Sequence, residues 1–136
     1  MVNIADHNNT KVFRYADAIL MMAECYLELD DTDNAMRYLN MVKDRAQIAR
    51  YETFKNYDHL HEEIERERAR ELFGEFQRKY DLVRWGSWYR QTFDYTDYKS
   101  LQDNILPCHE YYPIPDKEVT YSGNALDNDA YAEWGL

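Results

Sequence analysis

Apolar residues recur at helical spacing in two neighbouring segments near the start of the chain. In the first segment, residues 12–29, apolar side chains are separated by three or four positions until Asp30 and Asp31 interrupt the pattern. In the second segment, Thr32 can cap a helix whose inward-facing stripe is Ala35, Leu39, Val42 and Ala46. The pattern predicts a helical hairpin over residues 1–50.

This hairpin has the spacing of one tetratricopeptide repeat. The key positions of that repeat are held by Ile19, Met22, Ala23, Tyr26, Ala35, Leu39 and Val42. Ile19, Ala23 and Gln47 depart from the repeat, since they stand in place of the expected Trp, Gly and Pro. Because a single repeat cannot bury its own apolar face, we expect further helices to cover part of it and an exposed apolar patch or oligomerisation to account for the rest.

A third helical pattern occupies most of residues 51–86. Asp58 can cap it, Gly86 is a natural stop, and apolar and charged positions fall on separate faces up to about Trp85. We therefore predict one continuous helix, roughly 40 Å long, packed against the hairpin.

The charged face of this predicted helix carries both signs in an ordered row. A merely solvated helix can scatter its charges, so the row predicts a structural ion-pair network. Breaking a buried pair leaves an unpaired charge that costs about 3–5 kcal/mol, so Arg78→Ala or Asp81→Ala is expected to damage folding first. The predicted network comprises Glu67, Arg68, Glu71, Arg78, Asp81 and Arg84.

Helical periodicity weakens in residues 87–136. We interpret their start as a short helix followed by a long aromatic-rich loop, and their end as an irregular tail. Pro113 and Pro115 favour an extended segment, after which residues 116–119 can form one short turn. The predicted fold class is all-α: a tetratricopeptide-like hairpin packed with a long third helix, then a loop and tail, in one region spanning residues 1–136.

Long loops that carry many aromatic residues are often functional. A flat ring can lie against the apolar face of a pyranose while nearby amides or charged groups hydrogen-bond its hydroxyls. The candidate carbohydrate-binding residues are Trp88, Tyr89, Tyr95, Tyr98 and Asn104. The alternative is that the aromatic side chains simply pack the loop onto the helices.

The charge balance excludes two classes of partner. With 26 acidic and 16 basic residues, the chain has a net charge of −10, which repels nucleic-acid phosphates and anionic membrane surfaces. The longest apolar stretch, residues 18–23, is far shorter than the roughly 20 residues needed to span a bilayer. Residues 1–9 show neither the basic start nor the apolar core of an export signal, so we expect no such signal in this sequence.

Catalytic and metal-binding motifs are incomplete in this sequence. The string His61-Glu62-Glu63-Ile64-Glu65 begins like the zinc motif His-Glu-x-x-His but ends in Glu, and His59 points away from His61 on a helix. Cys25 and Cys108 have no spacing motif and are interpreted as a small buried residue and a loop thiol. No Gly-rich phosphate loop or nucleophile motif occurs, so we predict a protein that is not an enzyme and uses no metal or cofactor.

Three strings in sequence order resemble the carboxy-terminal region of the SusD/RagB family. They are residues 67–86 (ERARELFGEFQRKYDLVRWG), residues 112–119 (YPIPDKEV) and residues 125–131 (ALDNDAY). Residues 74–78, GEFQR, exchange the Gly and Phe of the family's more common Phe-Glu-Gly-x-Arg core. The resemblance covers nearly the whole chain but only the last part of a typical family member, so we interpret the sequence as a fragment or a truncated relative.

The resemblance implies a function at the outer membrane. SusD-like proteins are surface lipoproteins, anchored through a lipidated cysteine far upstream, that bind polysaccharides or other nutrients and cap a TonB-dependent transporter of the SusC type. It therefore implies a polysaccharide or oligosaccharide ligand and a SusC-type partner, with this region supplying mainly scaffold. The alternative, from another class, is a tetratricopeptide-like protein-interaction scaffold with no sugar binding of its own.

Overall fold

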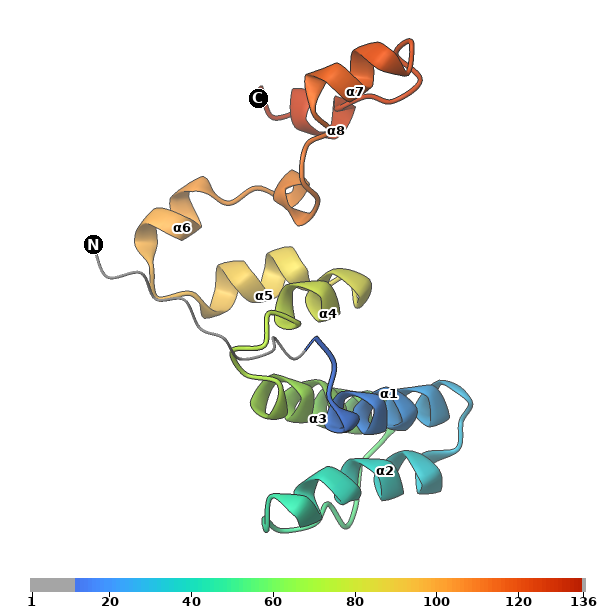
Figure 1. Cartoon of the computed structure of the whole chain (residues 1–136). Coiled ribbons are helices and arrows are strands. Elements are labelled where there is room, and N and C mark those ends of the chain that lie inside the picture. The colour runs from blue at the N-terminus through green and yellow to red at the C-terminus, as the bar shows by residue number, and fades with distance from the viewer. Residues whose placement is uncertain (1–11, 136) are drawn as a thin grey trace, which may run out of the picture. The chain divides into compact units, whose positions relative to one another are not determined.

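The computed structural model describes residues 12–135, and every regular element in this range is a helix (Figure 1). The predicted all-α fold class is confirmed. The chain divides into two compact units, here called the amino-terminal unit, which ends at Arg78, and the carboxy-terminal unit, which begins at Lys79. The expectation about an export signal in residues 1–9 lies outside the described range.

Three helices make up the amino-terminal unit: α1 (Tyr15–Glu28), α2 (Thr32–Arg45) and α3 (Tyr57–Glu71). Helix α2 runs back along α1, and α3 packs against both of them, as the blue, cyan and green helices of Figure 1 show. The predicted helical hairpin is therefore present, and a third helix covers part of it.

Polar side chains just before two of these helices fix where the helices begin. The Asp31 carboxylate accepts a hydrogen bond from the amide three residues later at 3.1 Å, and the Asn56 side chain does the same at 3.0 Å. Each contact satisfies one of the amide donors that a helix start leaves open. The predicted caps Thr32 and Asp58 are wrong, because the capping residues lie one and two positions earlier.

The core of the amino-terminal unit is apolar and closed to solvent. Ala23 and Ala35 are fully buried, and their small size lets α1 and α2 approach closely. Of the predicted inward stripe, Ala35, Leu39 and Val42 are buried, whereas Ala46 is exposed because α2 ends at the residue before it. Burying a Val, Leu or Ile side chain contributes about 1.5–3 kcal/mol. The largest fully buried side chains are Leu20, Leu27, Leu39, Leu60, Ile64 and Val42.

The predicted continuous helix up to Trp85 is wrong, because the chain turns at residues 72–77. Gly74 (φ +78°) and Phe76 (φ +63°) adopt left-handed backbone conformations that an α-helix does not contain. Glycine is a weak helix former that adopts positive φ without steric cost, so Gly74 favours this break. Helix α3 is roughly 22 Å long, about half the length expected, and a separate helix, α4 (Arg78–Arg84), follows the turn.

The turn also changes the exposure of aromatic side chains on the predicted apolar face. Leu72 is buried as that face requires, but Phe73 and Phe76 are almost completely exposed. A continuous helix would have carried both rings on the same face as Leu72. The left-handed residues at this turn direct the chain away from that register, so the two rings do not contribute to the core.

The carboxy-terminal unit holds more helix than residues 87–136 were expected to contain. The helices that follow α4 are α5 (Trp88–Tyr95), α6 (Lys99–Asn104), the 3-10 helix η1 (Pro107–Glu110), α7 (Asp116–Tyr121) and α8 (Asp129–Ala132). The expected short helix and the expected turn at 116–119 correspond to α5 and α7. The others span six residues or fewer, too short for helical periodicity to be visible in the sequence.

Gly86 ends α4, as predicted. Its φ of +63° suits a residue without a side chain, and the amides of Gly86 and Ser87 each donate back to a helix carbonyl at 2.9 Å. These two hydrogen bonds, to Val83 and Leu82, form the Schellman motif that commonly closes a helix.

Candidate functional site

The predicted carbohydrate-binding residues lie on two short helices of the carboxy-terminal unit. Trp88 and Tyr89 begin α5 and are half-buried, whereas Tyr95, at the end of α5, is 82% exposed. Tyr98 precedes α6 and is 74% exposed, and Asn104 is the last residue of α6. The structure therefore spreads these five residues along α5 and α6.

The contacts of these residues are mostly local. Lys79 Nζ lies 5.3 Å from the centre of the Trp88 ring, and the ring of Tyr89 packs against that of Phe93 at 5.9 Å. The Asn104 amide donates to a carbonyl within α6 at 2.6 Å. None of the five predicted residues is among those lining the two cavities found at the end of the chain and on α2.

An aromatic pocket of about 520 Å³ lies near the end of the chain, within the carboxy-terminal unit. It is formed by η1, the extended segment that follows η1, and the residues around α8. Four of its lining residues are aromatic and four more carry a carboxylate or an amide. The aromatic ones are Tyr111, Tyr112, Tyr131 and Trp134, and the polar ones are Glu110, Asp127, Asn128 and Glu133.

Two sets of hydrogen bonds tie the walls of the aromatic pocket together. The Asn128 side chain accepts from the amide of Ile114 at 2.8 Å and donates to the carbonyl of the same residue at 2.9 Å. The Tyr131 hydroxyl donates to the carbonyl of Tyr111. These contacts join α8 to the extended segment, so the pocket is held in place by backbone as well as side-chain groups.

The lining of the aromatic pocket has a definite electrostatic character. It contains three carboxylates and no basic side chain. Desolvation raises the pKa of the Tyr131 hydroxyl above its ordinary value. Lys79 contacts one wall from outside the lining, since its Nζ lies 4.1 Å from the centre of the Tyr112 ring.

The sequence interpretation missed this pocket, because it treated the end of the chain as an irregular tail. Two of the three family-like strings, residues 112–119 and 125–131, meet here through the contact between Ile114 and Asn128. Two aromatic pairs at or beside these strings, Tyr111 with Tyr112 and Tyr131 with Trp134, are the signal that could have indicated the site. Nothing in helical periodicity brings such pairs together.

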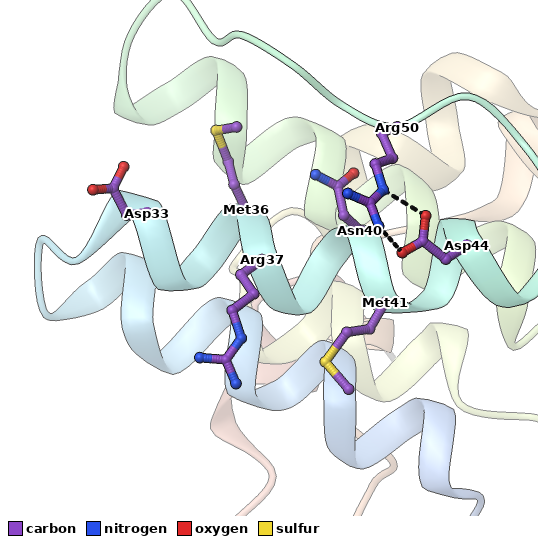
Figure 2. A pocket seen from close by; sticks show the side chains of 7 residues that line it. All are labelled: Asp33, Met36, Arg37, Asn40, Met41, Asp44 and Arg50. Carbon is purple, nitrogen blue, oxygen red and sulfur yellow. Dashed lines mark hydrogen bonds and ion pairs between the residues drawn. The ribbon is translucent and has the colours of Figure 1, made fainter.

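A second cavity, of about 350 Å³, lies along the outer face of α2 in the amino-terminal unit (Figure 2). Met36 and Met41 form its apolar part. Arg50 reaches it from the connector after α2 and makes two hydrogen bonds of 2.7 Å to Asp44, which lower the pKa of that carboxyl and raise the pKa of the guanidinium. The full lining is Asp33, Met36, Arg37, Asn40, Met41, Asp44 and Arg50.

Buried charges join the three helices of the amino-terminal unit. Arg68 Nη2 of α3 lies 2.9 Å from Asp17 Oδ1 of α1, and these side chains are only 4% and 6% exposed. Glu67 of α3 lies 3.7 Å from Lys43 Nζ of α2 and 2.9 Å from Arg70. Each carboxylate is therefore accompanied by a cation, which is what makes its burial tolerable.

A second group of ion pairs lies where α3 ends. Glu71 contacts Arg14 at 2.8 Å and Arg45 at 2.5 Å, and Arg14 also contacts Glu75 at 2.7 Å. The hydrogen bonds that Arg14 donates to Glu75 and, to a smaller extent, to Glu71 raise the pKa of Arg14, so its cation is further stabilised.

The six residues of the predicted network fall into three groups in the structure. Glu67, Arg68 and Glu71 belong to the ion pairs just described. Arg78 donates to the carbonyl of Glu65 at 3.3 Å, while the buried Asp81 pairs with Arg84 at 3.0 Å within α4. The pattern of a single helix could not show which residues elsewhere pair with this network. These partners are Arg14, Asp17, Lys43 and Arg45.

The two cysteines have the opposite exposure from the one expected. Cys25 is exposed on α1, because it lies on the helix face turned away from Ala23 and Leu27. Cys108 is buried in η1. Between residues 12 and 135, no group of three or more His, Cys, Asp or Glu side chains is placed to hold a metal ion, and no helix is long and apolar enough to cross a membrane.

The sequence model of the SusD family matches residues 2–131. This match spans nearly all of both units. The chain belongs to the SusD family. Among curated proteins, it is similar to "SusD-like protein P25" of Formosa agariphila, with 40% identity over 128 residues, which is 90% of this chain and 24% of that protein.

The solved structures include a related member of the family. The crystal structure of a SusD superfamily protein from Bacteroides vulgatus matches with a TM-score of 0.72 and 33% identity, covering 82% of this chain and 25% of that one. This SusD-family chain therefore spans about a quarter of the length of the two relatives. The predicted membership of the family is confirmed.

Proposed function

We propose that this chain works as part of a nutrient-binding protein that delivers polysaccharide or oligosaccharide to a TonB-dependent outer-membrane transporter of the SusC type. The observation that carries the proposal is the family match over residues 2–131. The protein would act by binding rather than by catalysis. In the full-length protein, an upstream lipid anchor would hold it at the outer membrane on the cell surface.

The two units suit different parts of this function. The amino-terminal unit, with its closed apolar core and paired buried charges, would serve as scaffold. The carboxy-terminal unit exposes aromatic rings, the side chains best suited to the apolar faces of sugars. We retain Trp88, Tyr89, Tyr95, Tyr98 and Asn104 as candidate glycan contacts, since Tyr95 and Tyr98 are largely exposed and flank the α5–α6 connection.

Two measurements test this function. Immobilised chain should retain a TonB-dependent transporter from detergent-solubilised outer membranes, identified by mass spectrometry, and isothermal titration calorimetry should detect binding of neutral oligosaccharides. Tyr95→Ala combined with Tyr98→Ala should weaken sugar binding without changing the circular dichroism spectrum, because both rings are exposed. Absence of both transporter capture and sugar binding would contradict the proposal.

A protein-interaction scaffold is the second candidate function, and the cavity on α2 favours it. Methionine side chains adapt to varied apolar partners, and Met36 and Met41 lie between charged groups that could orient a peptide. Because both methionines also pack against the apolar core, the mild pair Met36→Ala with Met41→Ala should weaken transporter capture while leaving the circular dichroism spectrum and sugar binding unchanged. Capture that this double substitution does not weaken argues against a role for the α2 cavity.

A further inference from the structure

We propose that the aromatic pocket formed by η1, the segment after it and α8 is a subsite for one uncharged pyranose unit. This inference rests on the proposed nutrient-binding function. It places sugar contacts on residues other than the candidates on α5 and α6. The volume of the aromatic pocket, about 520 Å³, falls within the range of sites that hold small molecules.

The rings of the pocket are available to a ligand. Trp134 is 48% exposed and Tyr112 is 81% exposed, and both line the pocket. A pyranose presents an apolar face of C–H groups, and stacking against an indole or phenol ring removes that face from water. Trp134 has the largest ring in the lining and is the principal stacking candidate.

The polar groups of the pocket match the rest of a sugar. Carboxylate oxygens accept hydrogen bonds from hydroxyl groups, and three carboxylates, from Glu110, Asp127 and Glu133, line the cavity. The Asn128 amide is already used to hold Ile114, so it orders the wall rather than the ligand. A polyhydroxylated ring can donate to several of these oxygens at once.

The same three carboxylates decide which sugars are rejected. A uronate or a sulfated sugar would bring a second negative charge into a cavity whose lining contains no basic side chain. The nearby Lys79, whose ammonium group lies over the rings of Tyr112 and Trp88 and donates to the carbonyl of His109 at 3.4 Å, offsets only one of these three negative charges. The pocket should therefore prefer neutral sugars strongly over acidic ones.

The pocket is also preorganised. The paired hydrogen bonds between Asn128 and Ile114 and the bond from Tyr131 to the Tyr111 carbonyl hold α8 against the extended segment. Little ordering entropy then remains to be lost when a sugar binds.

The test is calorimetric titration of the 136-residue chain with maltohexaose, cellohexaose and xylohexaose as neutral probes and with hexagalacturonate as the acidic probe. We expect saturable binding of at least one neutral probe and at least tenfold weaker binding of hexagalacturonate. Trp134→Ala should weaken the neutral interaction at least tenfold, whereas Trp134→Phe, which keeps an aromatic ring, should lose less. Tyr121→Ala is the matched control, since Tyr121 is an exposed aromatic residue on α7 outside the pocket lining, and it should bind as the unsubstituted chain does.

A charge test uses Glu110→Gln with Glu133→Gln, which should narrow the difference between neutral and acidic probes by raising affinity for hexagalacturonate. Neutral binding that is equal in Trp134→Ala and Tyr121→Ala overturns the pocket assignment but leaves the nutrient-binding function standing. Equal affinity of the unsubstituted chain for neutral and acidic probes overturns the assignment of an uncharged sugar. Absence of binding to every probe removes sugar binding from both proposals, while transporter capture remains a separate test of the proposed function.

Discussion

The amino-terminal unit is built from long helices around a closed core, whereas the carboxy-terminal unit is a succession of short helices with many exposed rings. In the described chain, the buried apolar residues of the carboxy-terminal unit are Leu82, Ile105 and Cys108, while all the others belong to the amino-terminal unit. The buried ion pair of Asp17 and Arg68 also lies in the amino-terminal unit.

This contrast separates stability from recognition. Burial of apolar area is the main source of folding free energy, so most of it should come from the amino-terminal unit. A ring that is buried in a core cannot contact a ligand, and the carboxy-terminal unit keeps Tyr112 and Trp134 accessible. The predictions that follow test this division, beginning with the largest expected effect.

Asp17→Ala should lower the free energy of unfolding by about 3–5 kcal/mol, because it leaves the Arg68 guanidinium buried without its carboxylate. Urea denaturation followed by circular dichroism measures this loss. Asp17→Leu combined with Arg68→Met removes both charges and should restore most of the stability. A loss below about 1 kcal/mol for Asp17→Ala would mean that the pair does not hold α1 and α3 together.

Leu60→Ala should cost about 2–5 kcal/mol, since Leu60 is fully buried between the helices of the amino-terminal unit. The comparison substitution in the carboxy-terminal unit is Leu101→Ala, at a position of α6 that is 40% exposed, and it should cost less than about 1 kcal/mol. The same urea titration compares the two. Equal losses would contradict the assignment of the stabilising core to the amino-terminal unit.

Sequence periodicity predicted the amino-terminal unit well, because α1, α2 and α3 are long enough to show an apolar stripe. It failed at residues 72–77, where Gly74 and Phe76 take left-handed conformations inside an otherwise continuous helical pattern. Periodicity also failed to predict α8 and the aromatic pocket, since that site depends on two hydrogen bonds between Ile114 and Asn128, which are fourteen residues apart. Contacts of this kind leave no period in the sequence.

Gly74→Ala should destabilise the amino-terminal unit by about 1–2 kcal/mol. A Cβ at this position meets no atom within 4 Å, so the cost comes from the positive φ alone. Phe73→Ala, at the exposed position beside it, is the control and should change stability by less than about 0.5 kcal/mol. A neutral or stabilising Gly74→Ala in thermal denaturation would show that the turn after α3 tolerates a right-handed backbone.

The smallest expected effect is a pH dependence confined to the amino-terminal unit. A hydrogen bond to Glu65, at 3.3 Å, raises the pKa of His61 above its ordinary value of 6.5, with smaller contributions from Glu24 and Glu28. Because the folded state binds the proton more tightly, the stabilisation is complete below the unfolded pKa and is lost as pH rises through the folded pKa. We expect it to be about 0.2–0.5 kcal/mol, the size of an exposed ion pair one helical turn apart.

Denaturation of the unsubstituted chain at pH 5.5 and pH 8.5 should reveal this loss, and His61→Gln should reduce it. Glu65→Gln should reduce it in the same way, because it removes the carboxylate that favours the imidazolium. If the free energy of unfolding depends on pH equally in both variants and in the unsubstituted chain, groups other than His61 and Glu65 cause that dependence.

Hydrogen exchange measured by mass spectrometry, with and without a saturating neutral oligosaccharide, tests the division between the two units most directly. We predict that the slowest-exchanging amides of the free chain lie in α1, α2 and α3, and that the sugar adds protection mainly to peptides covering residues 107–134. Added protection centred on α2, or slowest exchange in the carboxy-terminal unit, would contradict the assignment of stability to one unit and sugar recognition to the other.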